Sequence, residues 1–178
     1  DAPEHVQRLL DLCTAAIMAL EDRLWPIVGG VAGGTPLWGS WLPGHCIMMS
    51  EDVANLCKAS DYPRWAAPWT QRVIDRYDGA LIHNHALGLH DQPYIARLRG
   101  LRVLQISEDP NRERPLDHLE ELIKTTGGVA LQVYCRPDEI ERAVALARGG
   151  KVILQTSTDD VATANEIVRY VRAHSLIH

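Results

Sequence analysis

From residue 79 onward, short apolar runs alternate with amphipathic stretches, and this alternation constrains the fold more than any other feature of the sequence. Strands are predicted over 80–83, 101–106, 129–134 and 151–155, and helices over 92–98, 116–125, 137–148 and 159–173. Gly100, Gly127 and Gly149 follow predicted helices, where a left-handed cap favours glycine. Near-continuous apolar strands that alternate with helices are typical of a parallel sheet covered by helices.

The first 78 residues show this alternation less clearly. A long helix is predicted over 3–24, because apolar residues recur there at steps of three and four, and Pro26 is expected to end it. The residues of this apolar stripe are Val6, Leu9, Leu10, Cys13, Ile17 and Leu20. A strand is predicted over 37–42 and a helix over 62–77, and Ser50 is a candidate cap for a short helix between them.

The alternation allows two α/β architectures, an open doubly wound sheet and a (β/α)8 barrel. The open sheet usually carries a Gly-x-Gly-x-x-Gly turn, which this sequence lacks. A whole barrel needs ~250 residues, and the chain has 178. The sequence therefore predicts one domain, residues 1–178, that forms the later part of a (β/α)8 TIM barrel with about five βα units. We expect the first strands to be absent through truncation or proteolysis, or to be replaced by pairing in a homodimer.

Composition and charge exclude several classes of function. The net charge is −5 and no cluster of Lys and Arg occurs, so nucleic acid is not an expected partner. No apolar run approaches the ~18 residues of a membrane span, and no secretory leader is visible. The four cysteines are widely spaced without a Cys-x-x-Cys pair, which favours reduced thiols and a cytoplasmic location.

His83 and His85 close the most apolar of the predicted strands. Alternate residues of a strand point to the same face, so both imidazoles are expected on one side. Functional sites of parallel βα folds form where the strands end, at their carboxyl edge. The pair is therefore either a site or two hydrogen-bonded core histidines. With a carboxylate or Cys135 it could hold Zn²⁺, which accepts nitrogen, sulfur and oxygen ligands.

Other polar residues near predicted strand ends complete the candidate site. Asp52 is a candidate catalytic residue together with His83 and His85, and it is alternatively a helix cap. Cys135 is either a metal ligand or an inert core thiol. The candidate substrate-binding residues are His45, Glu51, Asn84, His90, Glu108 and Asn111, of which the last two also fit an ordinary turn.

Several segments together resemble the uroporphyrinogen decarboxylase superfamily. They are Trp41-Leu42-Pro43-Gly44, Met49-Ser50-Glu51-Asp52, Leu81-Ile82-His83-Asn84-His85, and Leu101 to Ile106 followed by Asp109-Pro110-Asn111. The resemblance implies a (β/α)8 barrel and two known activities. The porphyrinogen decarboxylases of that family use no cofactor, whereas its zinc-dependent methyltransferases move methyl groups between corrinoid proteins and thiols.

The methyltransferases carry a motif that resembles His-x-Cys-Gly-Asn at a strand end. His83 matches its first position, His85 stands where the cysteine would be, and no cysteine occurs in 152–160, where a later ligand belongs. The resemblance therefore implies zinc with altered ligands, such as His85 with Asp52 or Cys135, and a corrinoid carried by a partner protein.

Three functions are compatible with these observations. The first is a metal-assisted methyltransferase acting on a small-molecule thiol with a corrinoid methyl donor. The second is a cofactor-free decarboxylase of a porphyrinogen or other organic acid, in which His83, His85 or Asp52 donates a proton. The third is a non-catalytic half-barrel that needs a partner to cover its exposed sheet edges.

Overall fold

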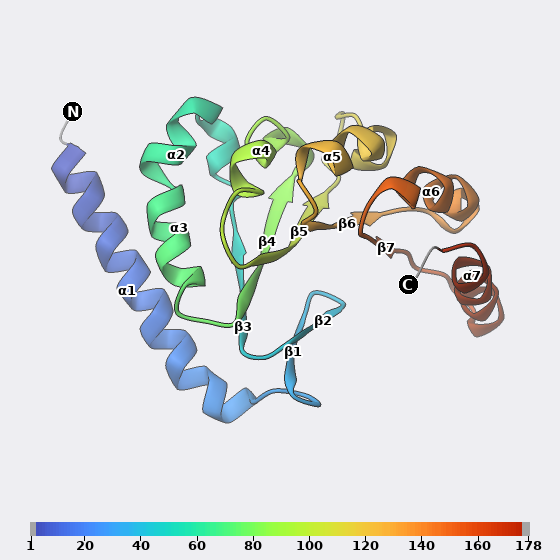
Figure 1. Cartoon of the computed structure of the whole chain (residues 1–178), viewed down its shortest axis with the longest axis horizontal. Helices are drawn as coiled ribbons and strands as arrows, with labels where there is room; N and C mark the ends of the chain where they lie inside the picture. Colours follow the sequence, from blue (N-terminus) through green and yellow to red (C-terminus); the bar gives the residue numbers. More distant parts are fainter. Residues whose placement is uncertain (1–2, 176–178) are drawn as a thin grey trace.

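A five-stranded parallel sheet forms the centre of the computed structural model, which describes residues 3–175 (Figure 1). Its strands are β3 (Cys46–Ser50), β4 (Gly79–His85), β5 (Leu101–Ser107), β6 (Ala130–Tyr134) and β7 (Val152–Gln155), and they lie side by side in this order. The order follows the chain without a reversal, whereas a doubly wound sheet reverses at its switch point. The α/β class and the parallel sheet are confirmed, and the arrangement is compatible with a partial α/β barrel.

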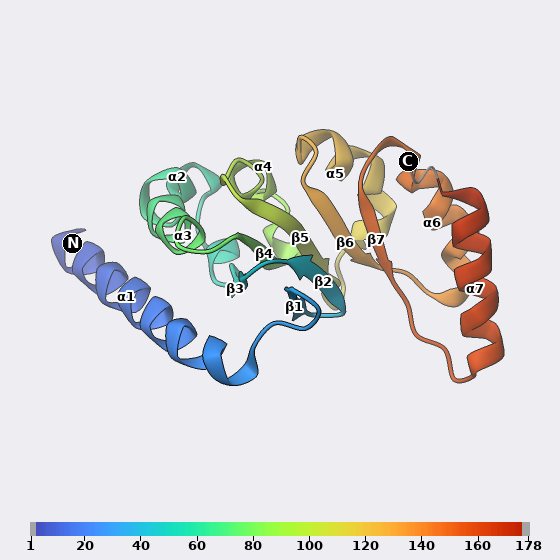
Figure 2. The same ribbon diagram turned by 60° about the horizontal axis from the view of Figure 1, so that its bottom comes forward.

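Helices alternate with these strands along the chain and cover one face of the sheet, as Figures 1 and 2 show. They are α2 (Tyr62–Trp65), α3 (Ala67–Ile74), α4 (Gln92–Ile95), α5 (Leu119–Thr125), α6 (Ile140–Leu146) and α7 (Val161–His174). The predicted helix over 62–77 is divided at Ala66, whose φ of −123° departs from helical geometry, just before Pro68. None of the helices within residues 3–175 has the length and apolarity needed to cross a bilayer.

The two faces of the sheet differ because alternate residues point to opposite sides. On the outer face, Ile82, Leu104 and Leu131 are buried against the helices and form the main core. On the inner face, Leu81 and Val103 form a smaller core near the amino ends of the strands. Further along, the inner face becomes polar. Ser50, His83, Gln105 and Gln132 occupy paired positions on four neighbouring strands.

The prediction of a single strand over 37–42 was wrong. This segment is an antiparallel hairpin of β1 (Gly34–Leu37) and β2 (Ser40–Pro43), and it lies on the inner side of the sheet (Figure 2). The chain reverses at Trp38 and Gly39, which both have positive φ, as the two-residue turn of a tight hairpin requires. The first parallel strand is instead β3, so Ser50 ends a strand and does not cap a helix.

The first helix, α1 (Pro3–Val28), continues past the predicted end at Pro26. Its last turn is held because the Trp25 ring stacks on His45, with ring centroids 3.8 Å apart. The helix ends at Gly29, whose φ of +48° suits a left-handed cap and whose N–H donates to the Trp25 carbonyl. Most of the apolar stripe that predicted this helix faces away from the rest of the molecule: Val6, Leu9, Ile17 and Leu20 are exposed, and Leu10 is half-buried.

Candidate metal centre

His83 and His85 lie at the carboxyl end of β4, and their side chains both point to the inner side of the sheet. Their Nε2 atoms are 3.0 Å apart, and their rings meet edge to face with centroids separated by 4.7 Å. The sequence predicted this shared face from strand alternation alone. The structure therefore brings the two imidazoles together, with His83 buried and His85 half-buried.

Asp52 completes a group of three because β3 is the neighbour of β4. The Glu51 amide donates to the His83 carbonyl at 2.9 Å, which continues the strand pairing and turns the next residue towards the histidines. The Asp52 Oδ1 atom lies 3.3 Å from Nε2 of His83 and 3.4 Å from Nε2 of His85. This oxygen is buried and has no hydrogen-bond partner within the described residues.

The other ring nitrogen of each histidine contacts a side chain from β5 or from the loop that follows it. His83 Nδ1 contacts Gln105 Oε1, and the amide nitrogen of Gln105 donates to Ser107 Oγ at 3.0 Å. His85 Nδ1 lies 2.9 Å from Asp109 Oδ1. The second oxygen of Asp109 accepts from the Leu87 amide at 2.8 Å, so this carboxylate is fixed from two sides.

These outer contacts determine which nitrogen of each ring carries a proton. Gln105 Oε1 and the Asp109 carboxylate are acceptors, so each histidine donates through Nδ1, and in the neutral form of each ring Nε2 carries a lone pair. Two nitrogen lone pairs and the Asp52 oxygen then face one another with no donor between them. The two nitrogen lone pairs and the carboxylate oxygen repel one another unless a cation lies among the three atoms. A metal ion or a proton would satisfy it.

The group is open on one side and enclosed on the other. Asp52 and His85 keep part of their side chains in contact with solvent. On the inner side, the Trp38 ring lies edge-on to His83 with centroids 4.2 Å apart. Trp38 also borders a groove of about 910 Å³ between β7, α6 and α7, which His83 and His85 do not line. Ligands can therefore approach from the side of Asp52 and His85.

Two predicted substrate-binding residues next to this group have structural partners. The Glu51 carboxylate points towards the helices and accepts from Tyr62 OH at 2.9 Å and from Thr70 Oγ1 at 2.8 Å. Burial raises the pKa of Glu51 above its usual value, and the hydrogen bonds from Thr70 and Tyr62 oppose that rise. Asn84 is buried and donates to the Gly88 carbonyl at 3.0 Å, which shapes the turn after β4.

The structure does not bring His45 or His90 into the group. His45 precedes β3 and so lies at the amino end of the strand, because this strand is not the one that the sequence predicted. Its Nε2 pairs with Glu21 of α1 at 2.9 Å. His90 Nε2 lies 3.2 Å from the Cys57 carbonyl and 3.3 Å from Asp91 Oδ2, and connects the loops after β3 and β4.

Glu108 and Asn111 follow β5 but contribute no atom to the group of three. Glu108 accepts from Arg114 Nε at 2.6 Å, and Asn111 is exposed with a φ of +61°, as its turn interpretation implied. Cys135 lies on the opposite side of the sheet, fully buried in the core beneath the helices. Burial raises the pKa of its thiol to about 11, which disfavours the thiolate that metal binding requires.

The sequence did not single out Gln105 or Trp38, and Asp109 was noted only in the segment that follows the predicted strand over 101–106. One signal was available for Gln105, since it is a polar residue inside an apolar strand, two positions from Val103 and on the same face. Its contact with His83 depends on the pairing of β4 with β5, in which these two residues are direct partners. The position of Trp38 depends on the hairpin, which was not predicted.

Comparisons with protein-family models, with curated proteins and with solved structures find no match for this chain.

Proposed function

We propose that this chain is a metal-dependent enzyme of the methyl-transfer type, with zinc held by His83, His85 and Asp52. The observation that carries the proposal is the convergence of three acceptor atoms, separated by 3.0 to 3.4 Å, with no donor among them. Two imidazole nitrogens and one carboxylate oxygen are ligands that zinc accepts, and catalytic zinc sites keep a further position open. The resemblance to zinc-dependent methyltransferases supplies the reaction class.

The side chains around the three ligands support such a role. Gln105 and Asp109 hold the two rings in the tautomer and orientation that expose Nε2, which is how outer residues commonly tune metal ligands. Asp52 contributes one negative charge, so a divalent ion would retain one positive charge and attract a substrate thiolate. Zinc bound there would supply Lewis acidity that lowers the pKa of a coordinated thiol. The corrinoid methyl donor would be carried by a partner protein.

A proton-transfer enzyme is the second candidate, and the same geometry supports it. The 3.0 Å separation of the two Nε2 atoms is also a hydrogen-bond distance. A proton held between the rings beside Asp52 would make the pair a general acid for protonating the product of a decarboxylation. A porphyrinogen or another organic acid would be the substrate in that case, and no metal would be required.

We also propose that the sheet belongs to a (β/α)8 barrel. Its support is the sequential strand order, the placement of the helices on one face, and the polar row on the opposite face at the carboxyl half of the strands. In barrels of this type the residues that point inward form layers, and active sites lie at the carboxyl ends of the strands.

Metal analysis of the purified protein tests the first proposal. We expect about one zinc per chain after incubation with zinc and dialysis, and loss of that zinc in His83→Gln and His85→Gln. His118→Gln is the matched control, because His118 pairs with Glu113 on the surface and lies outside the group. Zinc binding by the control with none by the two variants supports the proposal.

Two results would count against zinc. Wild-type protein that retains no metal after this treatment favours the proton-transfer enzyme, as does zinc that stays in both histidine variants. For the reaction itself, methyl transfer from methylcobalamin to a panel of thiols is measured by mass spectrometry. Transfer that requires zinc and His85 is expected, and carbon dioxide release from organic acids by metal-free protein would support the second candidate instead.

A further inference from the structure

The outward face of α1 is a long apolar surface with no partner within the described residues. Leu20 is 59% exposed and Ile27 is 80% exposed, and other large apolar residues line the same side of the helix. Figures 1 and 2 show α1 along one flank of the molecule, with only one side near α3. Isolated exposed apolar residues are common on proteins, but a continuous row of them marks an interaction surface.

The spacing of this row indicates what kind of partner it fits. Its residues follow one another at alternating steps of four and three, which we call the α1 seam: Val6, Leu10, Cys13, Ile17, Leu20, Leu24 and Ile27. An average step of 3.5 residues is the period of a coiled coil, in which one seam packs against the seam of another helix. No charged residue interrupts the seam over its whole length. The seam therefore fits a second helix that carries the same pattern.

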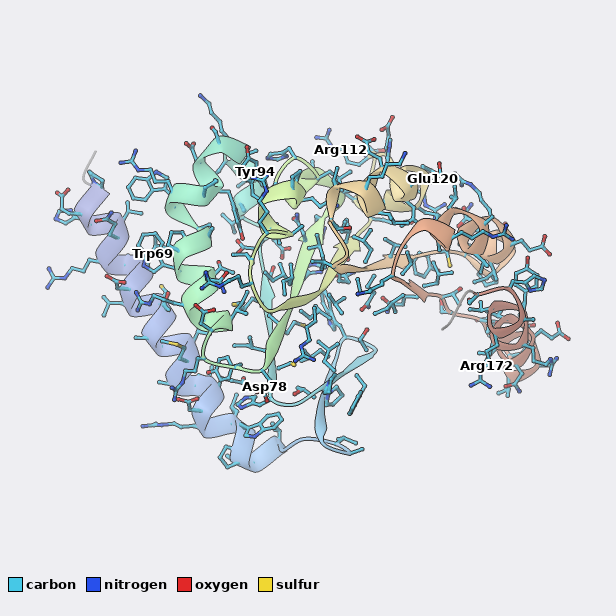
Figure 3. The ribbon with its side chains drawn as sticks, viewed as in Figure 1. Trp69, Asp78, Tyr94, Arg112, Glu120 and Arg172 are labelled. Carbon is cyan, nitrogen blue, oxygen red and sulfur yellow. The ribbon has the colours of Figure 1, made fainter. Side chains whose placement is uncertain are left out.

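The opposite side of α1 joins the molecule through polar contacts with α3, beside Thr14, which is buried, and Met18, which packs against the main core. Asp11 pairs with Arg72 at 2.6 Å and accepts from Trp69 Nε1 at 3.0 Å, and Asp22 pairs with Arg76 at 2.6 Å (Figure 3 labels Trp69). Exposed ion pairs of this kind contribute little stability. The helix thus directs Asp11 and Asp22 inward and most of its large apolar residues outward, whereas an ordinary surface helix exposes its charged residues.

We propose that two copies of this chain associate through their α1 seams as an antiparallel helix pair. Five of the seven seam residues are 40 to 80% exposed, and a specific stable interface of the kind a pair of seams would form buries about 1,200 Å² or more in total. A twofold pair needs a surface that complements itself. With Leu10 opposite Leu20 of the second copy, Ile17 faces Cys13 and Leu24 faces Val6, so these six positions are all matched.

The mass of the full chain in solution tests this pairing, measured by sedimentation equilibrium from about 1 to 100 μM. We expect a dimer for the wild type and a monomer for Leu20→Lys, whose dissociation constant should rise at least about 100-fold because two leucines are lost per dimer. Leu12→Lys is the matched control. Leu12 is 63% exposed on the same helix but lies outside the seam, so this variant should remain dimeric.

Two results would overturn the proposal. One is a wild-type chain that stays monomeric at 100 μM, which would assign the seam to a different protein. The other is a Leu20→Lys variant that dimerises as tightly as Leu12→Lys. Circular dichroism of each variant verifies folding, and Leu20 makes few internal contacts to lose because it is largely exposed. Zinc content does not enter this measurement, so its outcome is independent of the proposed function.

Discussion

At the scale of single residues, the two histidines are defined by what their outer nitrogens contact. His83 contacts an amide oxygen of Gln105, and His85 contacts the carboxylate of Asp109. A carboxylate makes its imidazole more electron-rich than an amide does, so His85 is expected to be the stronger metal ligand. The difference between the two rings therefore originates in β5 and the loop after it, outside the strand that carries them.

Asp109→Ala should weaken zinc binding about 10- to 100-fold, the usual effect of removing such an outer partner. The physical reason is that the His85 ring loses the group that fixes its orientation and tautomer. Competition with a chelating dye measures the affinity. Glu108→Ala is the control, because the neighbouring carboxylate binds Arg114 and not the ring. Equal affinities for the two variants would contradict the assigned role.

Asp91 is a second residue whose surroundings lead to a prediction, in this case about the dependence of folding stability on pH. Its carboxylate is buried, neither oxygen accepts a hydrogen bond within the described residues, and His90 Nε2 lies 3.3 Å from Oδ2. Burial raises the pKa of Asp91 above the usual value of 3.8, and the charge of His90 opposes that rise. A raised folded pKa means that stability falls as pH rises from about 3.8 through the folded value.

Asp91→Asn should therefore stabilise the protein at pH 7, by about 1–2 kcal/mol, because it removes a buried charge whose oxygens accept no hydrogen bond within the described residues. The gain should vanish below pH 3.8, where the wild-type carboxyl is protonated. Urea unfolding at pH 7 and below pH 3.8 measures the free energy of unfolding of the variant and the wild type. Asp159→Asn is the control, because Asp159 is exposed. A loss of stability at pH 7 would show that the charge has a partner or a function.

At the scale of elements, sequence patterns located most of the strands but not the first part of the sheet. The pair His83 and His85 could be predicted because strand alternation is local, and the parallel strands β4 to β7 could be predicted from their apolar runs. The hairpin and β3 could not, because Trp38 is an unusual residue at a positive-φ turn and the Cys46–Ser50 run has no alternation. The Asp52 and Gln105 contacts depend on strand pairing, which a single sequence does not reveal.

An ion-pair network at the carboxyl ends of β5 and β6 connects two helical segments. Arg114, which precedes α5, contacts Glu139 at 2.5 and 2.9 Å, and Arg136 also binds this carboxylate. The hydrogen bonds from Arg114 lower the pKa of Glu139 to about 2. A lowered pKa contributes stability that is present above the usual value of 4.5 and is lost as pH falls through about 2.

Glu139→Gln should destabilise the protein by about 1–3 kcal/mol at neutral pH, since charge-assisted hydrogen bonds are replaced by weaker ones. The difference from wild type should shrink as pH falls from 4.5 towards 2. Thermal unfolding across this range measures the effect, and the exposed Glu141→Gln on α6 is the control. A difference that does not change with pH would mean that the ion pair is not its cause.

At the scale of the whole molecule, the two faces of the parallel sheet differ in chemistry. Its outer face is apolar and covered by helices, and its inner face carries the polar row and the group of Asp52, His83 and His85. α1 adds a third surface on the flank, which is suited to a second copy. A dimer formed there would leave the inner face free for the substrate and the corrinoid partner that we propose.

Anomalous diffraction shows whether the three converging atoms of His83, His85 and Asp52 hold a metal ion. Crystals of zinc-loaded protein, measured on both sides of the zinc absorption edge, should show one strong peak about 2.0–2.2 Å from His83 Nε2, His85 Nε2 and an Asp52 oxygen. Zinc found elsewhere, with the two Nε2 atoms still in contact with each other, would contradict the metal assignment and leave the shared proton as the explanation of this geometry.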